Sequence, residues 1–366
     1  MAKELRRGYT TGTCAAAAAR AAALALWRGE TVHRVALTLP RGEKITIPVT
    51  LLHKDADEAE AMVIKDAGDD PDVTDGAAVH VRAWKQAKGL VLRGGEGIGT
   101  VTRPGLAVPV GEPAINPVPR AMINNAVADL VPTGQGLELE ISIPRGEELA
   151  RRTLNPRLGI TGGLSILGTT GIVEPMSEEA FRTSLVPQID VALAAGWETL
   201  ALTPGRLGQR HAEEKYCLPA TAVILTSNFI GYLLEACAER PVKRVLLWGH
   251  AGKLVKVAGG IFYTHSHIAD ARQEIIAARA AAAGASRELV QQILAATTVE
   301  AVQELLRGTD LEPGFWDSLA ARASQRAMAL VHGALTVGTA LLDLQGEIMG
   351  LDAAARQIMG DLGYGR

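Results

Sequence analysis

The sequence is poor in cysteine, has no excess of positive charge and contains no long uninterrupted apolar run. Its three cysteines, Cys14, Cys217 and Cys237, lie far apart and form no CxxC pattern, which argues against a disulfide framework or a cysteine-based metal site and indicates reduced thiols. Lys and Arg number 37 against 40 Asp and Glu, a net charge of −3. That balance disfavours nucleic acid as a general partner.

No stretch reaches the roughly 18 uninterrupted apolar residues that a membrane span needs. Residues 14–27 (CAAAAARAAALALW) follow a basic stretch and superficially resemble a signal peptide, but Arg20 interrupts the apolar run. The residues after Trp27 (RGETVHRV) offer no small-residue cleavage site. We therefore expect a cytoplasmic protein with no membrane partner.

What the sequence does contain is enough apolar material for real cores. With 366 residues, 48% of them hydrophobic, it is long enough for two or three domains of roughly 150 residues each. Alternating strand patterns and few helices predict a mixed α+β domain over residues 1–150. The expected elements are a helix from Thr11 or Thr13 to Trp27, a hairpin of Val32–Leu39 and Lys44–Thr50, strands at Ala59–Lys65, Ala77–Trp84, Gly89–Leu92 and Leu137–Ile143, and a helix at Pro117–Leu130.

The pattern changes after the charged segment Arg145–Arg157, which ends on Asn-Pro and predicts a domain boundary. Short apolar strands then alternate with helices, which is typical of a parallel, doubly wound sheet. The expected strands are Leu164–Leu167, Thr199–Thr203, Ala222–Thr226 and Arg244–Trp248, with helices at Glu178–Ala195, Gln209–Lys215 and Phe229–Glu239. This predicts a Rossmann-like domain over residues 151–270. Residues 271–366 are expected to form a helical segment with a terminal hairpin at 340–350, packing on the other two domains.

Unusual residues follow all four expected strands of the parallel sheet. In such sheets the ligand lies outside the carboxyl ends of the strands, where small residues admit it and hydroxyl, amide and helix N–H groups bond it. The same residues are also common turn formers, so any one loop is ambiguous, but four in register favour a site for a polar cofactor. The loops are Gly168-Thr169-Thr170-Gly171, Thr203-Pro204-Gly205, Ser227-Asn228 and Gly249-His250-Ala251-Gly252-Lys253.

The common nucleotide motifs are absent. The string GHAGKL has Leu247 in place of the first P-loop glycine and Leu254 in place of the Ser or Thr that binds magnesium. The string GEGIGT ends on Thr100, where a dinucleotide fingerprint needs glycine. The sequence therefore gives no local support for ATP hydrolysis or NAD binding.

Other polar segments are candidates for binding carboxylates or metals. The Gly- and Pro-rich segment Arg93–Arg120 is too long and irregular for regular structure, and its Arg103, Asn116 and Arg120 can bind carboxylates unless it is only a packed connector. The aspartates of KDAGDDPDVTDG lack EF-hand spacing and indicate a turn. His265 and His267 have no third ligand nearby and are interpreted as capping or surface residues. We expect no protein-bound metal.

Several long strings, taken together, resemble a known family. They are RRGYTTGTCAAAA, KDAGDDPDVT, GGEGIGTVTRPGLAVPVGEPAINPVPR, LGTTGIVEPMS, SNFIGYLLE and GHAGKLVKVAGGIFYTHSHIADAR. Collinear over roughly Arg6 to Arg272, they resemble the CbiD-type cobalt-precorrin-5B C1-methyltransferases of the anaerobic cobalamin pathway. One departure is Arg206, where the family usually has Asn after Pro-Gly.

The resemblance implies transfer of a methyl group from S-adenosylmethionine to C1 of cobalt-precorrin-5B, giving cobalt-precorrin-6A. The cobalt arrives with the corrinoid substrate, and positioning rather than a covalent nucleophile supplies the catalysis. On this interpretation His250 is the candidate catalytic base. The expected cofactor-binding residues are Gly168, Thr169, Thr170, Gly171, Pro204, Gly205, Ser227, Asn228 and Gly249. The expected substrate-binding residues are Thr10, Thr11, Thr13, Arg103, Asn116, Arg120, Lys253 and Lys256.

Two other functions stay open at this point. A noncatalytic tetrapyrrole carrier or chaperone would share the basic loops without needing a cofactor crevice. A small-molecule kinase would need a phosphate cradle, which the motifs do not supply. The sequence leaves the oligomeric state undetermined.

Overall fold

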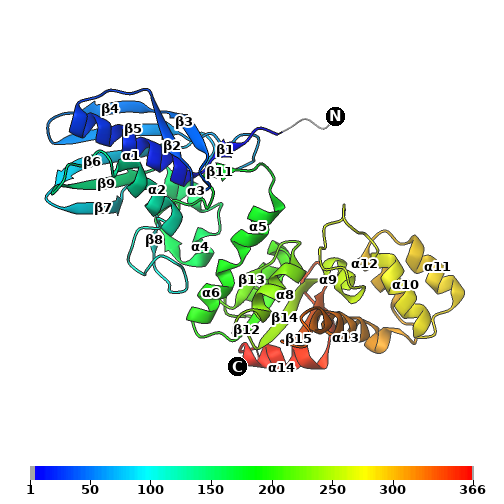
Figure 1. The fold of residues 1–366 in the computed structure, drawn as a ribbon. Helices are drawn as coiled ribbons and strands as arrows, with labels where there is room; N and C mark the ends of the chain where they lie inside the picture. Colours follow the sequence, from blue (N-terminus) through cyan, green and yellow to red (C-terminus); the bar gives the residue numbers. More distant parts are fainter. Residues whose placement is uncertain (1–4, 365–366) are drawn as a thin grey trace. The chain divides into compact units, whose positions relative to one another are not determined.

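The first long helix is made largely of alanine, and the computed structural model, which describes residues 5–364, buries almost all of it. Helix α1 (Thr11–Arg28) begins where the Thr10 hydroxyl accepts the Thr13 N–H and ends at Gly29 in the left-handed conformation, φ 68°. Its alanine side chains, Ala17 among them, are almost completely buried. Because alanine has so little volume, the helix lies close against strands β5 (Glu58–Ile64) and β6 (Ala78–Gln86) (Figure 1).

The chain divides into two compact units, Met1–Glu178 and Glu179–Arg366. In the first, a five-stranded sheet has the order β4-β5-β6-β9-β7 and is antiparallel except where β7 runs parallel to β9. Smaller two-stranded pairs are β1-β11, β2-β3 and β8-β10. The remaining elements of this unit are β1 (Gly8–Tyr9), β2 (Arg34–Thr38), β3 (Lys44–Pro48), β4 (Thr50–Lys54), β7 (Gly89–Gly94), β8 (Thr100–Val101), α2 (Pro117–Val127), β9 (Gly136–Ser142), α3 (Gly146–Ala150), α4 (Asn155–Leu158), β10 (Ile160–Thr161) and β11 (Ile172–Val173).

The second unit contains a sheet of order β13-β12-β14-β15-β16, in which the first four strands are parallel and β16 is antiparallel. Helices α9 and α13 pack against β15 on one face. On the other face, Trp248 and Tyr216 form a core with side chains of α14. The elements are α5 (Glu178–Leu185), α6 (Pro187–Ala194), β12 (Thr199–Thr203), α7 (Arg206–Arg210), β13 (Val223–Leu225), α8 (Ile230–Ala238), β14 (Arg244–His250), α9 (Ala251–Ala258), α10 (Arg272–Ala282), α11 (Arg287–Ala295), α12 (Val299–Leu306), α13 (Glu312–Leu330), β15 (Thr336–Leu342), β16 (Ile348–Leu351) and α14 (Ala353–Asp361).

The expected mixture of α/β and α+β structure is confirmed, with several sheets of mixed strand orientation. Most expected strands and helices of the first unit are present within a few residues of their predicted limits. Strand β4 was not predicted, because it is an edge strand whose side chains are mostly exposed and lack a buried alternation. The units divide at Glu178, whereas the sequence predicted limits near 150 and 270.

The prediction of Leu164–Leu167 as the first strand of the parallel sheet is wrong. This segment belongs to the first unit, where it makes only isolated bridges, Leu164 with Ile98 and Ile166 with Ile115. The fourth parallel strand is instead β15, which pairs with β14 and then turns into the predicted terminal hairpin with β16. A short apolar run carries no information about which sheet it joins, and this caused the error.

Two helix predictions also need correction. The single helix expected over 178–195 is divided into α5 and α6, because Pro187 has no N–H and begins a new helix as its first residue. The helix expected over 209–215 starts earlier, as α7, and continues as a turn of π-helix over His211–Lys215. The largely helical stretch after residue 270 is confirmed.

The close packing of α1 gives a direct test. Ala17→Leu adds volume at a fully buried position of α1, so we expect it to reduce the free energy of unfolding by about 1–3 kcal/mol. Ala121→Leu, on the exposed side of α2, is the matched control and should change it by less than about 0.5 kcal/mol. Urea denaturation followed by circular dichroism would measure both, and equal effects would contradict the tight packing.

Candidate functional site

Three of the four loops predicted to bind a ligand meet at the carboxyl edge of the parallel sheet in the second unit. Pro204-Gly205 follows β12, Ser227-Asn228 follows β13, and His250 ends β14. The Thr226 hydroxyl donates to the carbonyl of Thr203, which ties two of these loops together. Open α/β sheets bind their ligands at this edge.

Lys253 connects these loops. Its side chain, from the first turn of α9, places Nζ 2.7 Å from the carbonyl oxygen of Pro204 and 3.0 Å from Oδ1 of Asn228. Both acceptors are neutral, and no carboxylate of residues 5–364 forms an ion pair with this ammonium. Burial, followed by repulsion from Lys256, lowers the pKa of Lys253. A partly buried cation without a counter-charge is suited to an anionic ligand.

The glycines beside Lys253 leave room for a ligand at one position and not at another. A Cβ atom on Gly205 would meet only Nζ of Lys253, 4.0 Å away, so this backbone is open. A Cβ atom on Gly249 would lie 2.9 Å from Cδ of Pro204, so Gly249 serves the packing of the two strand ends. Ser227 has a positive φ of 53°, a conformation uncommon for a residue other than glycine.

Lys256, predicted to bind substrate alongside Lys253, has a different environment. The residue is 3% exposed, and its Nζ donates to the carbonyls of Thr264 (3.2 Å) and Ala269 (2.8 Å), with an Asp270 carboxylate oxygen at 3.8 Å. These contacts fix the connection from α9 to α10. The geometry therefore supports a structural role for Lys256 and does not support ligand binding.

His250, the predicted base, has both ring nitrogens engaged. Nδ1 accepts the N–H of Gly252 at 3.2 Å and so caps α9, while Nε2 lies 2.6 Å from Oε1 of Glu300 on α12. The neutral ring therefore carries its proton on Nε2 and donates to Glu300. Burial acts to raise the pKa of Glu300, but the hydrogen bonds from His250, its own backbone N–H and Thr298, together with attraction to His250, outweigh burial and lower the pKa. The geometry supports a helix cap tied to α12 rather than a free base.

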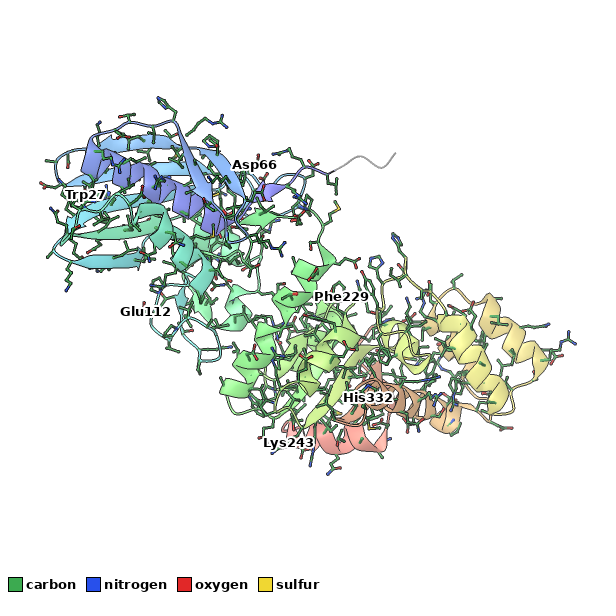
Figure 2. All side chains as sticks on the ribbon, viewed as in Figure 1. Trp27, Asp66, Glu112, Phe229, Lys243 and His332 are labelled. Carbon is green, nitrogen blue, oxygen red and sulfur yellow. The ribbon has the colours of Figure 1, made fainter. Side chains whose placement is uncertain are left out.

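The segment 261–272, which follows α9, packs against the loop after β13. The sequence did not predict that this segment belongs to the candidate site. The N–H of Thr264 donates to the carbonyl of Asn228 at 3.0 Å, and Tyr263 stacks on Phe229, with ring centroids 4.9 Å apart. Figure 2 labels Phe229 at the start of α8. The Thr264 hydroxyl is buried and has no hydrogen-bond partner among the described residues. The string FYTHSH was visible in the sequence, but nothing local indicated that it returns to the loop after β13.

The fourth loop, Gly168–Gly171, lies in the first unit and binds the start of α1. The carbonyl of Gly171 accepts the Thr10 N–H at 3.1 Å and the Thr13 hydroxyl at 2.6 Å. The Thr11 hydroxyl accepts the N–H of Leu167 at 2.9 Å. All three threonines are buried, so these contacts support a structural role and not the predicted binding of substrate. The Thr170 hydroxyl bonds the backbone of Ile172, and Thr169 is exposed.

The packing of Gly171 can be tested against a matched glycine. Gly171 has φ 87°, and a Cβ atom there would lie 2.6 Å from Cδ2 of Leu39 and 2.9 Å from Oγ1 of Thr13. Gly111 has φ 89° with nothing within 4 Å, so Gly111→Ala carries the backbone strain alone. We expect Gly171→Ala to destabilise the protein by about 1–3 kcal/mol more than Gly111→Ala in urea denaturation. Equal losses would contradict the steric explanation.

The predicted carboxylate-binding residues of the first unit lie on its surface. Arg120 and Val108 line a pocket of about 340 Å³, in which Glu112, labelled in Figure 2, lies 4.0 Å from the Arg120 guanidinium. The side chain of Arg103 covers Gly159 and donates to the carbonyl of Arg157 at 3.4 Å. Asn116 precedes α2, is exposed, and its side chain makes no capping hydrogen bond.

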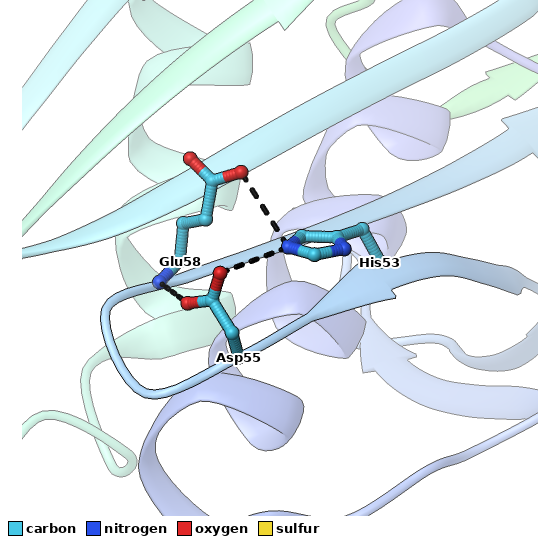
Figure 3. Close-up of side chains that lie close together, drawn as sticks. All are labelled: His53, Asp55 and Glu58. Atoms are coloured by element: carbon cyan, nitrogen blue, oxygen red, sulfur yellow. Dashed lines mark hydrogen bonds and ion pairs between the residues drawn. The ribbon is translucent and has the colours of Figure 1, made fainter.

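Within residues 5–364, one group of three potential metal-binding side chains lies close together, namely His53, Asp55 and Glu58 (Figure 3). Nε2 of His53 is 3.0 Å from Oδ2 of Asp55 and 3.6 Å from Oε1 of Glu58. Asp55 also accepts the N–H groups of Glu58 and Asp57, which lower its pKa to about 2. These contacts are those of an exposed turn between β4 and β5.

No helix in the described residues is long and apolar enough to cross a membrane.

The fold and the strand-end loops define a mixed α/β protein in which small and polar loops meet at the carboxyl edge of a parallel sheet. The CbiD family profile matches residues 1–175, and the profile "CbiD, C-terminal domain" matches residues 263–353. The chain belongs to the CbiD family. The likeness therefore extends well beyond Arg272, where the sequence resemblance was expected to end.

Curated relatives support this assignment over the whole chain. A cobalt-precorrin-5B C(1)-methyltransferase of Moorella thermoacetica is 83% identical over 366 residues, which is 100% of both chains. The protein of the same name from Desulfitobacterium hafniense is 50% identical over 96% of this chain and 91% of that one. A crystal structure of a cobalamin biosynthesis protein (CbiD) from Archaeoglobus fulgidus is 29% identical, covering 74% of this chain and 84% of that one with a TM-score of 0.38.

Proposed function

We propose that this protein is a cobalt-precorrin-5B C1-methyltransferase that uses S-adenosylmethionine and gives cobalt-precorrin-6A in anaerobic cobalamin biosynthesis. One relative of that name covers the full length of the chain, and a second covers 96% of it. The observation that carries the assignment of the methyl-donor site is the Lys253 ammonium, held between the loops after β12 and β13 without a carboxylate partner in the described residues.

When bound, S-adenosylmethionine supplies an electrophilic methyl group on a sulfonium, together with an anionic carboxylate. Lys253 suits that carboxylate, because two of its N–H donors are fixed by Pro204 and Asn228 and the third remains for a ligand. The open backbone at Gly205 admits the ligand, and Thr264, whose backbone bonds Asn228, carries a buried hydroxyl that is a further candidate hydrogen-bonding group. On this basis the second unit is a Rossmann-like donor-binding domain.

Methyl transfer to a ring carbon needs the two reactants in line more than it needs a nucleophile in the protein. The function of this chain is therefore to hold and orient, and His250 contributes through the start of α9 rather than as a base. For the corrinoid, whose rim carries acetate and propionate groups, we propose Arg120 as a carboxylate anchor, with Arg103 and Asn116 as further candidates. The pocket beside Arg120 supports this. We further propose a cytoplasmic enzyme with no nucleic-acid partner.

Titration calorimetry with S-adenosylhomocysteine, followed by single-turnover methyl transfer read by mass spectrometry, tests this function. We expect binding of the nucleoside and a mass gain of one methyl group on the corrinoid. Corrinoid binding without affinity for S-adenosylhomocysteine and without methyl transfer would overturn the proposal in favour of the carrier.

The substrate anchor has its own test. Arg120→Ala should raise the corrinoid KM about tenfold, the effect of one lost charge-assisted hydrogen bond, and leave S-adenosylhomocysteine affinity unchanged. Arg93→Ala is the matched control, because Arg93 is an exposed arginine of the first unit paired with Glu138 and is not proposed to bind ligand. Equal changes in both variants would contradict the anchor.

A further inference from the structure

A continuous row of rings runs from α5 into the wall of the candidate site. The ring centroids of Phe181 and Phe229 are 5.8 Å apart, and Tyr263 stacks on Phe229 at 4.9 Å with an interplanar angle of 26°. The row continues from Tyr263 to His265 at 6.3 Å and from His265 to His267 at 4.9 Å. Phe181 and His267, at the two ends of the row, are exposed, whereas Phe229 between them is buried, so the row passes through the edge of the core and its histidine end lies in solvent.

The outer part of this row is fixed to the site by backbone contacts. Phe229 and Tyr263 form an antiparallel bridge, and Thr264 bonds the carbonyl of Asn228 through its N–H. The Lys256 ammonium donates a hydrogen bond to the carbonyl of Thr264. Because Asn228 also accepts from Lys253, hydrogen bonds connect the proposed donor site to Thr264, the residue before His265.

The two histidines differ in what their ring nitrogens can do. Nδ1 of His265 accepts the N–H of His267 at 3.2 Å, so the neutral ring of His265 carries its proton on Nε2, where it is a donor. The ring of His267 has no hydrogen bond or ion pair within residues 5–364. His267 is therefore the histidine of this pair with a nitrogen lone pair available to an external ligand.

A single imidazole is too small a ligand set to hold a resident metal ion, since protein zinc sites use three or four side chains. A cobalt ion in a corrinoid is different, because the macrocycle already supplies its equatorial nitrogens and only axial positions are open. Imidazole nitrogen is a good ligand for late first-row metals such as cobalt. One exposed imidazole at the end of an aromatic row therefore fits a flat, metal-bearing ring.

We propose that His267 coordinates the cobalt of the corrinoid substrate from one axial side. The proposal rests on the proposed function, which supplies the corrinoid. A ring-nitrogen lone pair of His267 forms the bond to cobalt and a weakly held water leaves, with no change of oxidation state. The other ring nitrogen keeps its proton. This contact makes the enzyme prefer a corrinoid that already contains its metal over the metal-free macrocycle.

Electron paramagnetic resonance of bound cob(II)yrinic acid, a cobalt corrinoid with free side-chain carboxylates, tests this directly. Axial ligation by one nitrogen splits each cobalt line into three, so we expect triplets with the wild-type protein and with His265→Ala. His267→Ala should lose the triplets and bind this probe about tenfold more weakly, as for one lost strong contact. The same variant should bind metal-free hydrogenobyrinic acid as well as the wild type does.

The result separates this inference from the function on which it rests. S-adenosylhomocysteine affinity, measured in parallel by calorimetry, should be the same in all three proteins, which verifies that the variants are folded. Unsplit cobalt lines in a wild-type protein that binds both the probe and the nucleoside would overturn the axial contact and leave the methyltransferase intact. Failure of the wild type to bind either ligand would overturn both proposals.

Discussion

Lys253→Met is expected to lower the affinity for S-adenosylhomocysteine by about ten- to a hundredfold, because a hydrogen bond to a charged group contributes about 1.5–3 kcal/mol. The net stability of the protein should change little, because removing an ammonium that is desolvated and repelled by Lys256 offsets the loss of its hydrogen bonds to Pro204 and Asn228. Calorimetry measures the first effect, and urea denaturation measures the second. Loss of affinity without loss of stability is the signature of a ligand-binding cation.

Lys256→Met is the matched control, three residues later on the same helix. This lysine donates to two backbone carbonyls. Its removal leaves both carbonyls without a hydrogen-bond donor and the nearby Asp270 without this positive charge. We expect a destabilisation of about 1–3 kcal/mol, the cost of unsatisfied buried polar groups, and a smaller effect on nucleoside affinity. If the two variants behaved alike, the distinction between a binding lysine and a structural lysine would be wrong.

The pH dependence of binding gives a third readout for Lys253. The pKa of its ammonium is lowered from the usual 10.5, and only the charged form attracts a carboxylate. Affinity for S-adenosylhomocysteine should therefore be full at neutral pH and should fall as the pH rises through the lowered pKa, below 10.5. The Lys253→Met variant should show no such fall.

Lys65→Met is expected to have the largest effect on stability, a loss of about 3–5 kcal/mol, because it leaves one partner of a buried ion pair without the other. The Lys65 side chain is 1% exposed, and its Nζ lies 2.8 Å from Oδ2 of Asp72. Asp72 in turn accepts the N–H and hydroxyl of Thr74 and so holds the acidic loop after β5. Urea denaturation of the full chain would measure the loss.

The double variant Lys65→Met with Asp72→Asn is the control that separates charge from shape. An asparagine keeps the acceptor for Thr74 and removes the charge, so the pair becomes neutral on both sides. We expect the double variant to be clearly more stable than either single variant, a coupling that a double-mutant cycle measures. Additive losses would contradict a coupled ion pair.

The Lys65–Asp72 ion pair also predicts that the protein loses stability at acid pH. Burial acts to raise the pKa of Asp72, but attraction to Lys65 and the hydrogen bonds from Lys65 and Thr74 outweigh it and hold the pKa below 3.8. The ionised carboxylate therefore stabilises the fold above the unfolded-state pKa, and this contribution is lost as the pH falls through the lowered folded-state pKa. The Asp72→Asn variant should lack this part of the acid-induced loss.

The sequence by itself determined the local structure and the residue types of the site. The capped alanine helix and the alternating strands were predictable because their hydrogen bonds and periodicities involve neighbours a few residues apart. The small and polar residues at Pro204-Gly205 and Ser227-Asn228 were predictable for the same reason, since each directly follows an apolar strand. The family was also recognisable from the sequence, because its long motifs are local strings.

Only the tertiary structure decided which of these elements meet. Local pattern could not show that Leu164–Leu167 joins the first unit while Thr336–Leu342 completes the parallel sheet, because strand pairing depends on partners distant in sequence. Nor could it distinguish Lys253 from Lys256, which share a helix but contact different segments. The engagement of His250 by Glu300, fifty residues away, is likewise a property of packing. Side-chain roles depend on these long-range contacts, which hydrophobic periodicity does not encode.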